Sequence, residues 1–311
     1  VAKISAEVRH PGPLAESKVI IDVDDLPFDH KLYQACNPAA QKVISQLNLR
    51  GGIDAHLVLY RPPGPGNKHR PHLQGRLKNC AITYEHFPYE LKDFNGQVEW
   101  DAEDWFFEEM TATHGAAKLA AAGSFKKSDG GLLNMVLTAV DVKFEDEDFY
   151  YALPDALQQV ADQFQAQGRF DMIGTHITWT PGSLPVVNIR QLDLKNNSIK
   201  LREFPYPFHN VVGRVSIVNN PQLNRRDIIL HELEARHGDD KKLTLNGLGY
   251  ILPDGEWHVS FEDLKVDDLD TGHRFRKALP AGVRSFFEAT DPRGNSISVD
   301  GQLALRGTPN G

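Results

Sequence analysis

Apolar and polar residues alternate over short stretches along most of the chain, and this period of two is typical of half-buried β-strands. Between residues 97 and 101, for example, Val98 and Trp100 alternate with three polar residues. Short turn-forming connections such as Asp129-Gly130 and Asp254-Gly255 separate these stretches, and they favour antiparallel neighbours joined in a meander. Parallel strands would need longer crossover connections. The pattern therefore predicts a mainly β fold built from antiparallel meanders.

An internal repeat with a period of about 120 residues organises these stretches. A pattern of an acid, an apolar residue, any residue, an apolar residue and an acid starts at Asp25, Asp141 and Asp263. Other short segments recur in the same order with nearly constant spacing: 87–89 with 204–206, 96–98 with 213–215, and 114–115 with 237–238. A colinear series of this kind predicts copies of one structural unit stacked along the chain.

A proline recurs in each copy, at Pro38, Pro154 and Pro280, and a stretch with helical periodicity follows it. Proline fits the first position of a helix, because its φ is already helical and its missing N–H would be unpaired there. The prediction is an elongated array of curved antiparallel meander units with one short helix each. The expected units are 1–130, 131–255 and a partial third copy at 256–311.

The alternation also assigns one set of apolar residues to a single face of the predicted sheet. A helix of about nine residues in each unit is too short to cover six strands, and large apolar faces are rarely left to water. A lipid or another partner could cover this face. In the alternative interpretation each unit is a closed sandwich with the helix as its plug, and the same residues are ordinary core. The candidate face-lining residues are Val98, Trp100, Phe106, Met110, Leu119, Val215, Ile217, Ile229, Leu233, Leu243 and Leu245.

Composition narrows the possible partners. The 34 basic and 42 acidic residues leave a formal net charge of −8, so the chain lacks the positive charge that a nucleic-acid partner requires. No apolar run approaches the roughly 20 residues of a membrane-spanning helix, and any membrane anchor is expected outside this segment. Cys36 and Cys80 could form a disulfide or stay as two thiols, and the sequence leaves both open.

Motifs for catalysis or metal binding are not found. His231 and His237 are six residues apart, whereas a helical zinc-protease site needs its histidines four apart. In a strand they would lie about 20 Å from each other, too far for one ion. Nucleophile-elbow, phosphate-loop and dinucleotide motifs are also missing from the sequence. We therefore predict no catalytic residue, no metal and no cofactor, although paired carboxylates of a carbohydrate-active enzyme would leave no short motif.

The segments at 87–98 and 204–215, each beginning Phe-Pro-Tyr, together with the two His-Gly pairs and the Leu-Pro helix starts, give the chain a family resemblance. It resembles the AsmA-like proteins of Gram-negative-type cell envelopes, which belong with the bridge-like lipid transfer proteins built from repeating β-groove units. The resemblance implies a periplasmic, non-enzymatic module whose concave apolar face carries phospholipid or another acyl lipid, with envelope proteins as further candidate partners. A helix in every unit departs from that family's nearly pure strand grooves and could cover the groove.

Two other functions stay open at this stage. One is an extracytoplasmic repeat module that binds proteins or builds structure, and the other is a carbohydrate-active enzyme. A continuous apolar face would favour lipid binding, separate filled sandwiches would favour the interaction module, and a cleft with paired carboxylates would favour the enzyme.

Overall fold

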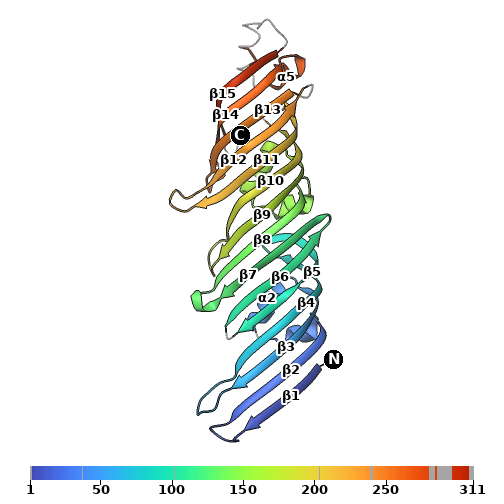
Figure 1. Ribbon diagram of the computed structural model, residues 1–311, viewed down its shortest axis with the longest axis vertical. Coiled ribbons are helices and arrows are strands. Elements are labelled where there is room, and N and C mark those ends of the chain that lie inside the picture. The colour runs from blue at the N-terminus through green and yellow to red at the C-terminus, as the bar shows by residue number, and fades with distance from the viewer. Residues whose placement is uncertain are drawn as a thin grey trace. The chain divides into compact units, whose positions relative to one another are not determined.

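A computed structural model describes residues 2–36, 38–101, 103–202, 204–238, 241–279, 284–285 and 296–307. Its strands form one open antiparallel sheet in which each strand lies beside its neighbours in the sequence (Figure 1). The predicted mainly β meander is therefore confirmed. The chain divides into two compact units, residues 1–139 with 176–186 and residues 140–175 with 187–311, and the repeat boundaries expected from the sequence stay a prediction.

The described strands are β1 (Ala2–Arg9), β2 (Glu16–Pro27), β3 (Arg50–Arg61), β4 (Arg70–Tyr84), β5 (Phe87–Asp101), β6 (Asp104–His114), β7 (Ala117–Lys126), β8 (Leu132–Lys143), β9 (Gln167–Trp179), β10 (Val186–Lys200), β11 (Pro207–Asn220), β12 (Arg225–His237), β13 (Lys241–Ile251), β14 (Trp257–Asp270) and β15 (Ser296–Gly307). The described α-helices are α1 (His30–Ala35), α2 (Pro38–Gln46), α3 (Glu147–Ala152), α4 (Asp155–Phe164) and α5 (His273–Ala278). All of them lie in the connections after β2, β8 and β14.

Each proline-initiated helix in the described part of the chain follows a second, shorter helix. The predicted helices are present as α2, which begins at Pro38, and α4, for which Pro154 is the N-cap. The short helices α1 and α3 precede them. The Asp29 carboxylate accepts two backbone N–H bonds of 2.9 Å at the start of α1, and Asp146 accepts one of 3.2 Å in α3. The helix expected from Pro280 lies outside the described residues.

The recurring acidic motif marks a β-bulge at the end of the strand that leads into the helices. Asp25 and Asp141 have positive φ angles of 53° and 59°, a left-handed conformation that side chains rarely adopt. Each donates its backbone N–H to a carboxylate on the next strand, Asp54 at 2.9 Å and Asp171 at 2.8 Å. The bulge therefore loses a ladder bond but keeps its N–H paired with a side chain of the next strand.

The third copy of this motif lies five residues later than the sequence pattern indicates. The residue with the same features is Asp268, which has a φ of 43° and donates its N–H to the Ser298 hydroxyl at 3.2 Å. Asp263 has neither a positive φ nor that bond among the described contacts. The match at 263–267 is therefore wrong in register, because an acid-and-apolar pattern is common at strand ends and does not identify the bulge residue.

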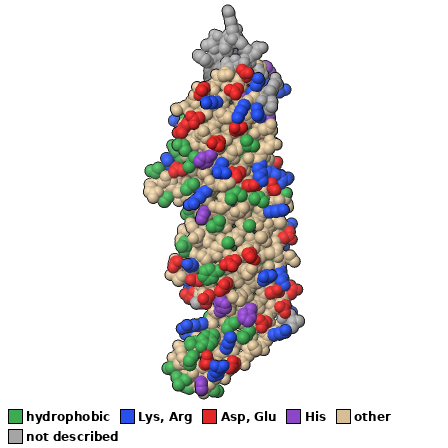
Figure 2. Space-filling view, viewed as in Figure 1, with side chains coloured by type: hydrophobic (Ala, Val, Ile, Leu, Met, Phe, Trp, Pro, Cys, Tyr) green, Lys and Arg blue, Asp and Glu red, His purple; other side chains and the backbone are tan. Residues whose placement is uncertain are grey.

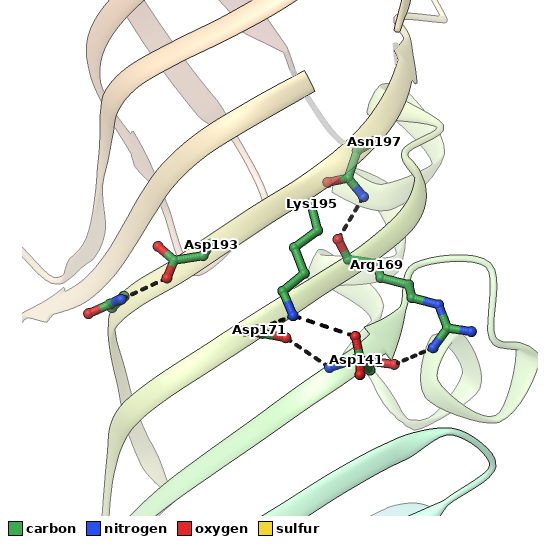
Figure 3. Close-up of polar contacts among 7 residues, drawn as sticks. Asp141, Arg169, Asp171, Asp193, Lys195 and Asn197 are labelled. Carbon is green, nitrogen blue, oxygen red and sulfur yellow. Dashed lines mark hydrogen bonds and ion pairs between the residues drawn. The ribbon is translucent and has the colours of Figure 1, made fainter. Parts of the chain in front are cut away.

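Ionic contacts fix the bulge at Asp141 across three strands (Figure 3). Lys195 of β10 lies 2.6 Å from the Asp171 carboxylate of β9 and 3.5 Å from that of Asp141 in β8. Arg169 donates to the carbonyl of Asp141 at 3.4 Å, and Asn197 donates to the carbonyl of Arg169 at 3.0 Å. Because Asp171 is largely shielded, with its side chain 14% exposed, this pairing is worth more than a pair on the open surface.

Glycines at equivalent repeat positions let adjacent strands approach closely. A Cβ on Gly96 would lie 3.0 Å from the Cα of Met110, and one on Gly213 would lie 2.9 Å from the Cα of Leu233. Both glycines have positive φ, 159° and 131°. The two contacts are counterparts in the repeat, so the matched Gly-x-Val segments reflect the same strand packing in each copy.

We expect Gly213→Ala to destabilise the protein by about 2–3 kcal/mol, because alanine is strained at this φ and its methyl group would displace Leu233. Gly301→Ala is the matched control, since a Cβ there meets no atom within 4 Å, and it should change stability by less than about 0.5 kcal/mol. Urea unfolding of both variants measures the difference. Equal stability of the two variants would contradict the packing described.

Candidate functional site

Cross-strand pairs define a continuous apolar face in the first compact unit. Directly paired residues of antiparallel strands point to the same side of the sheet. One row of consecutive partners across β1 to β7 is apolar throughout: Ile4, Ile21, Leu57, Leu73, Trp100, Trp105 and Phe125. The indole rings of Trp100 and Trp105 stack with centroids 5.6 Å apart. We call this side the apolar face of the first unit.

The connection between β2 and β3, which contains α1 and α2, packs against one end of this face. Ile53, Leu77, Cys80 and Met110 form a buried cluster near the helix end of their strands. Phe28 and Leu49, which flank α1 and α2 in the sequence, pack against that cluster. Toward the hairpin end the row from Ile21 to Phe125 is only half-buried. At the sheet edge, Ile4 is 70% exposed and Val8 is 57% exposed, so this part of the face is open to solvent.

The second compact unit has a corresponding apolar face across β10 to β15. Two rows of consecutive partners define it: Ile189, Ile217, Ile228, Gly249, Val259 and Leu305, and Leu192, Val215, Leu230, Gly247, Phe261 and Leu303. Here the helix reaches further over the strands, because Phe164 of α4 contacts Trp257 of β14 with ring centroids 5.7 Å apart. Val259 is buried, whereas Leu303 of the last described strand is 45% exposed, so this face is covered in part and open in part.

Most of the residues assigned to one face by alternation do lie on the apolar faces. These are Val98, Trp100, Met110 and Leu119 in the first unit, and Val215, Ile217, Leu233, Leu243 and Leu245 in the second. The register brings each group together within its own unit. Whether these side chains contact a ligand stays a prediction.

Phe106 and Ile229 lie on the opposite side of the sheet. Phe106 pairs with Glu99, and Ile229 pairs with Ser216. The assumption that strict alternation continues through both strands is wrong, because β6 and β12 each contain a bulge, at Glu109 and Glu232, with φ of 51° and 46°. One extra residue moves every later side chain to the other face.

Trp105 and Phe107 also occupy the apolar face of β6, although strict alternation did not predict them there. Phe107 pairs with Val98 and packs against the buried cluster, and Trp105 pairs with Trp100. Asp101 pairs with Asp104, and Trp100 pairs with Trp105. The two tryptophans therefore share a face, whatever follows in β6.

The opposite side of the sheet is rich in polar and charged residues. In Figure 2, acidic, basic and histidine side chains are interspersed over the face in view. In the second unit a shallow depression of about 450 Å³ is lined by Arg190, Arg214, Ser216, His231, Glu232 and Asn246.

The depression contains a serine and histidine pair, but its geometry does not activate the serine. The Ser216 hydroxyl donates to the carbonyl of Arg190 at 2.7 Å and lies 3.3 Å from Nε2 of His231. A general base must accept the hydroxyl proton, and here that proton points to a carbonyl. The contact therefore positions two strands rather than preparing a nucleophile.

Two histidines pack against tyrosine rings, and both cysteines are free thiols. The bulge at Glu232 puts His231 and His237 on opposite faces, so they cannot share an ion. His237 is completely buried beside Tyr206, and Tyr89 stacks on His114 at the equivalent place with centroids 3.9 Å apart. Cys36 and Cys80 are both free thiols. Burial raises the pKa of the Cys80 thiol, which makes it less reactive.

Comparisons with protein-family models, with curated proteins and with solved structures found no match. The family resemblance therefore stays a prediction. Among the described residues, no helix combines the length and the apolar composition needed to cross a membrane.

Burial lowers the pKa of His237 below its ordinary value, which makes stability depend on pH. The unfolded chain binds a proton near pH 6.5 while the folded protein still excludes it. Stability is therefore complete above about pH 6.5 and decreases as the pH falls toward the lower folded pKa. We expect His237→Gln to flatten this slope between pH 7 and 5.5, measured by urea unfolding. His231→Gln is the control, because His231 is exposed on the polar side of the sheet, and it should leave the pH dependence of stability unchanged. An unchanged pH dependence in His237→Gln would show that His237 is not its cause.

Proposed function

We propose that the apolar faces bind the acyl chains of a phospholipid or another lipid, and that the chain is a non-enzymatic lipid-binding or lipid-transfer module of a cell envelope. The observation that carries this proposal is the open row from Ile4 to Phe125. Seven consecutive strands each contribute one apolar side chain to this row of cross-strand partners, and these side chains are half-buried or exposed. An apolar surface that is not covered by the protein itself is typical of a binding site.

The chemistry of this row suits a hydrocarbon chain. Its side chains are aliphatic or aromatic, so they provide contact area without hydrogen bonds that would select a particular ligand. Transfer of a methylene group from water to such surroundings contributes about 0.8 kcal/mol. Ten methylenes of an acyl chain would therefore contribute on the order of 8 kcal/mol before the entropic cost of binding.

The envelope and periplasmic setting is what the family resemblance implies. The resemblance also supplies lipid transfer between membranes as the biological role. Partial covering by helices limits that role in one respect. In the second unit α4 lies against Trp257, so an acyl chain there would need the helix to move or would occupy only part of the face.

A protein-interaction module is the second candidate, and one observation favours it. Every residue of β1 is exposed, and within the part of the chain that the structure describes β1 pairs with β2 on one side. An edge strand offers unpaired N–H and C=O groups on which another strand can add. Strand addition would leave the apolar face free, so the two candidates differ in whether purified protein retains lipid.

Ile217→Glu tests the lipid proposal on the apolar face of the second unit. Ile217 is half-buried, so a carboxylate there can reach water and stability should fall by less than about 2 kcal/mol. An acyl chain lying beside the carboxylate would lose several kcal/mol of favourable transfer, so copurified lipid should decrease more than about tenfold. Lipid extraction with mass spectrometry and thermal unfolding are measured on the same samples.

Ile229→Glu is the matched control, because it makes the same change on the opposite face of the neighbouring strand. It should leave the lipid content unchanged. Unchanged lipid in a folded Ile217→Glu protein, or equal loss in both variants, would count against the proposal. A collapse in the stability of Ile217→Glu would show that this residue is sealed core.

A further inference from the structure

One arginine interrupts the apolar face of the first unit at its hairpin end. Arg61 is the last residue of β3 and pairs with Ser17 of β2. Two residues earlier on each strand, Leu59 pairs with Val19. The register shows no shift in this region, so Arg61 is on the same side of the sheet as Leu57 and Leu59.

The surroundings of Arg61 leave part of its hydrogen-bonding capacity unused. The residue is half-buried, and its Nε is buried without a hydrogen-bond partner among the described residues. A buried donor without a partner costs free energy, so a movement of the half-buried Arg61 side chain that brings this donor to an outside acceptor would be favoured. Ser17, its cross-strand partner, has its hydroxyl 3.0 Å from Nε2 of His69. The Arg61 guanidinium and the hydrogen-bonded Ser17 and His69 pair therefore lie at one end of the apolar face.

The second unit has an arginine in a comparable position. Arg226 lies near the hairpin start of β12 and pairs with Asn219 and Ile251. It is two residues from Ile228, in a segment without a register shift, so it also belongs to the apolar side. It too is half-buried. A guanidinium at the hairpin end of the apolar side thus occurs independently in both units.

We propose that Arg61 binds the anionic oxygen headgroup, phosphate or carboxylate, of an acyl lipid whose hydrocarbon chain lies along the row through Leu57 and Leu73. This inference rests on the proposed function and adds the headgroup class and its position. The planar guanidinium can donate two parallel hydrogen bonds to such a group. The adjacent Leu59 and Leu57 lead directly from the headgroup position to the half-buried row, so one amphiphile fits both features.

Headgroup selectivity separates this inference from plain acyl binding. The probes are fluorescent phosphatidylglycerol, which is anionic, and fluorescent diacylglycerol with the same chains, which is uncharged. The wild-type protein should bind phosphatidylglycerol about tenfold more tightly than diacylglycerol, the equivalent of 1.4 kcal/mol. Arg61→Gln should remove that preference and leave diacylglycerol binding unchanged. Arg61→Lys keeps the positive charge but lacks the planar guanidinium, so it should retain part of the preference for phosphatidylglycerol.

Arg76→Gln is the matched control, because Arg76 pairs with Asp54 on the opposite face. It should behave as the wild type. Equal binding of both probes by the wild type, or an unchanged preference in Arg61→Gln, would overturn the headgroup site while leaving acyl binding intact. Binding of neither probe by the wild type would overturn the proposed function and this inference together.

Inorganic phosphate distinguishes a lipid headgroup from a free anion. Phosphate alone at the probe concentration should not stabilise the wild-type protein in a thermal scan, because it lacks the chain that provides most of the binding. Stabilisation of the wild type but not of Arg61→Gln by phosphate, without binding of either lipid probe, would assign the site to a small anion and overturn the lipid assignment.

Discussion

Register across strands that carry bulges is the constraint on which the rest of this structure depends. A bulge adds one residue, so the apolar positions of the sequence must change phase at the same point if one face is to stay apolar. β6 and β12 both do so. Phe107 and Met110 share a face although they are three residues apart, and Leu230 and Leu233 do the same. Bulges also increase the local twist of a strand, so a sheet that repeats them in successive strands becomes curved without losing its apolar side.

The polar residues of the motif are explained by the same constraint. A left-handed residue within a strand leaves its N–H without a ladder partner, and a side chain of the next strand must accept it. Asp54 and Asp171 do this for Asp25 and Asp141, and Asn246 does it for Glu232 at 2.7 Å. The acids that the sequence repeats are therefore parts of the backbone geometry rather than ligands. Lys195 then balances the charge that two neighbouring aspartates create.

The elements that could be predicted from sequence are those set by local pattern. Alternation and short turns identified the meander, and Pro38 and Pro154 identified two helices. The faces of Phe106 and Ile229 could not be predicted, because a bulge residue such as Glu109 has no distinctive side chain. The six-residue helices α1 and α3 are too short to show periodicity, and only the capping residues Asp29 and Asp146 indicate them. Arg61 was missed because its significance depends on Leu59 and Val19 beside it, a relation that exists only once β2 and β3 pair.

The apolar face of the first unit is buried at the helix end of its strands and accessible at the hairpin end. At the helix end, Met110 and Cys80 are sealed by the segments around α1 and α2, and a ligand there would have to displace core. At the hairpin end, Leu57 and Leu73 are half-buried, and Arg61 adds a cation. A hydrocarbon chain gains the most binding free energy where apolar side chains are accessible, and an anion gains the most where a guanidinium has unused hydrogen-bond donors. The two preferences meet at the hairpin end, so an amphiphile bound there would keep its charged group at the margin of the sheet and its chain across the strands, perpendicular to their direction.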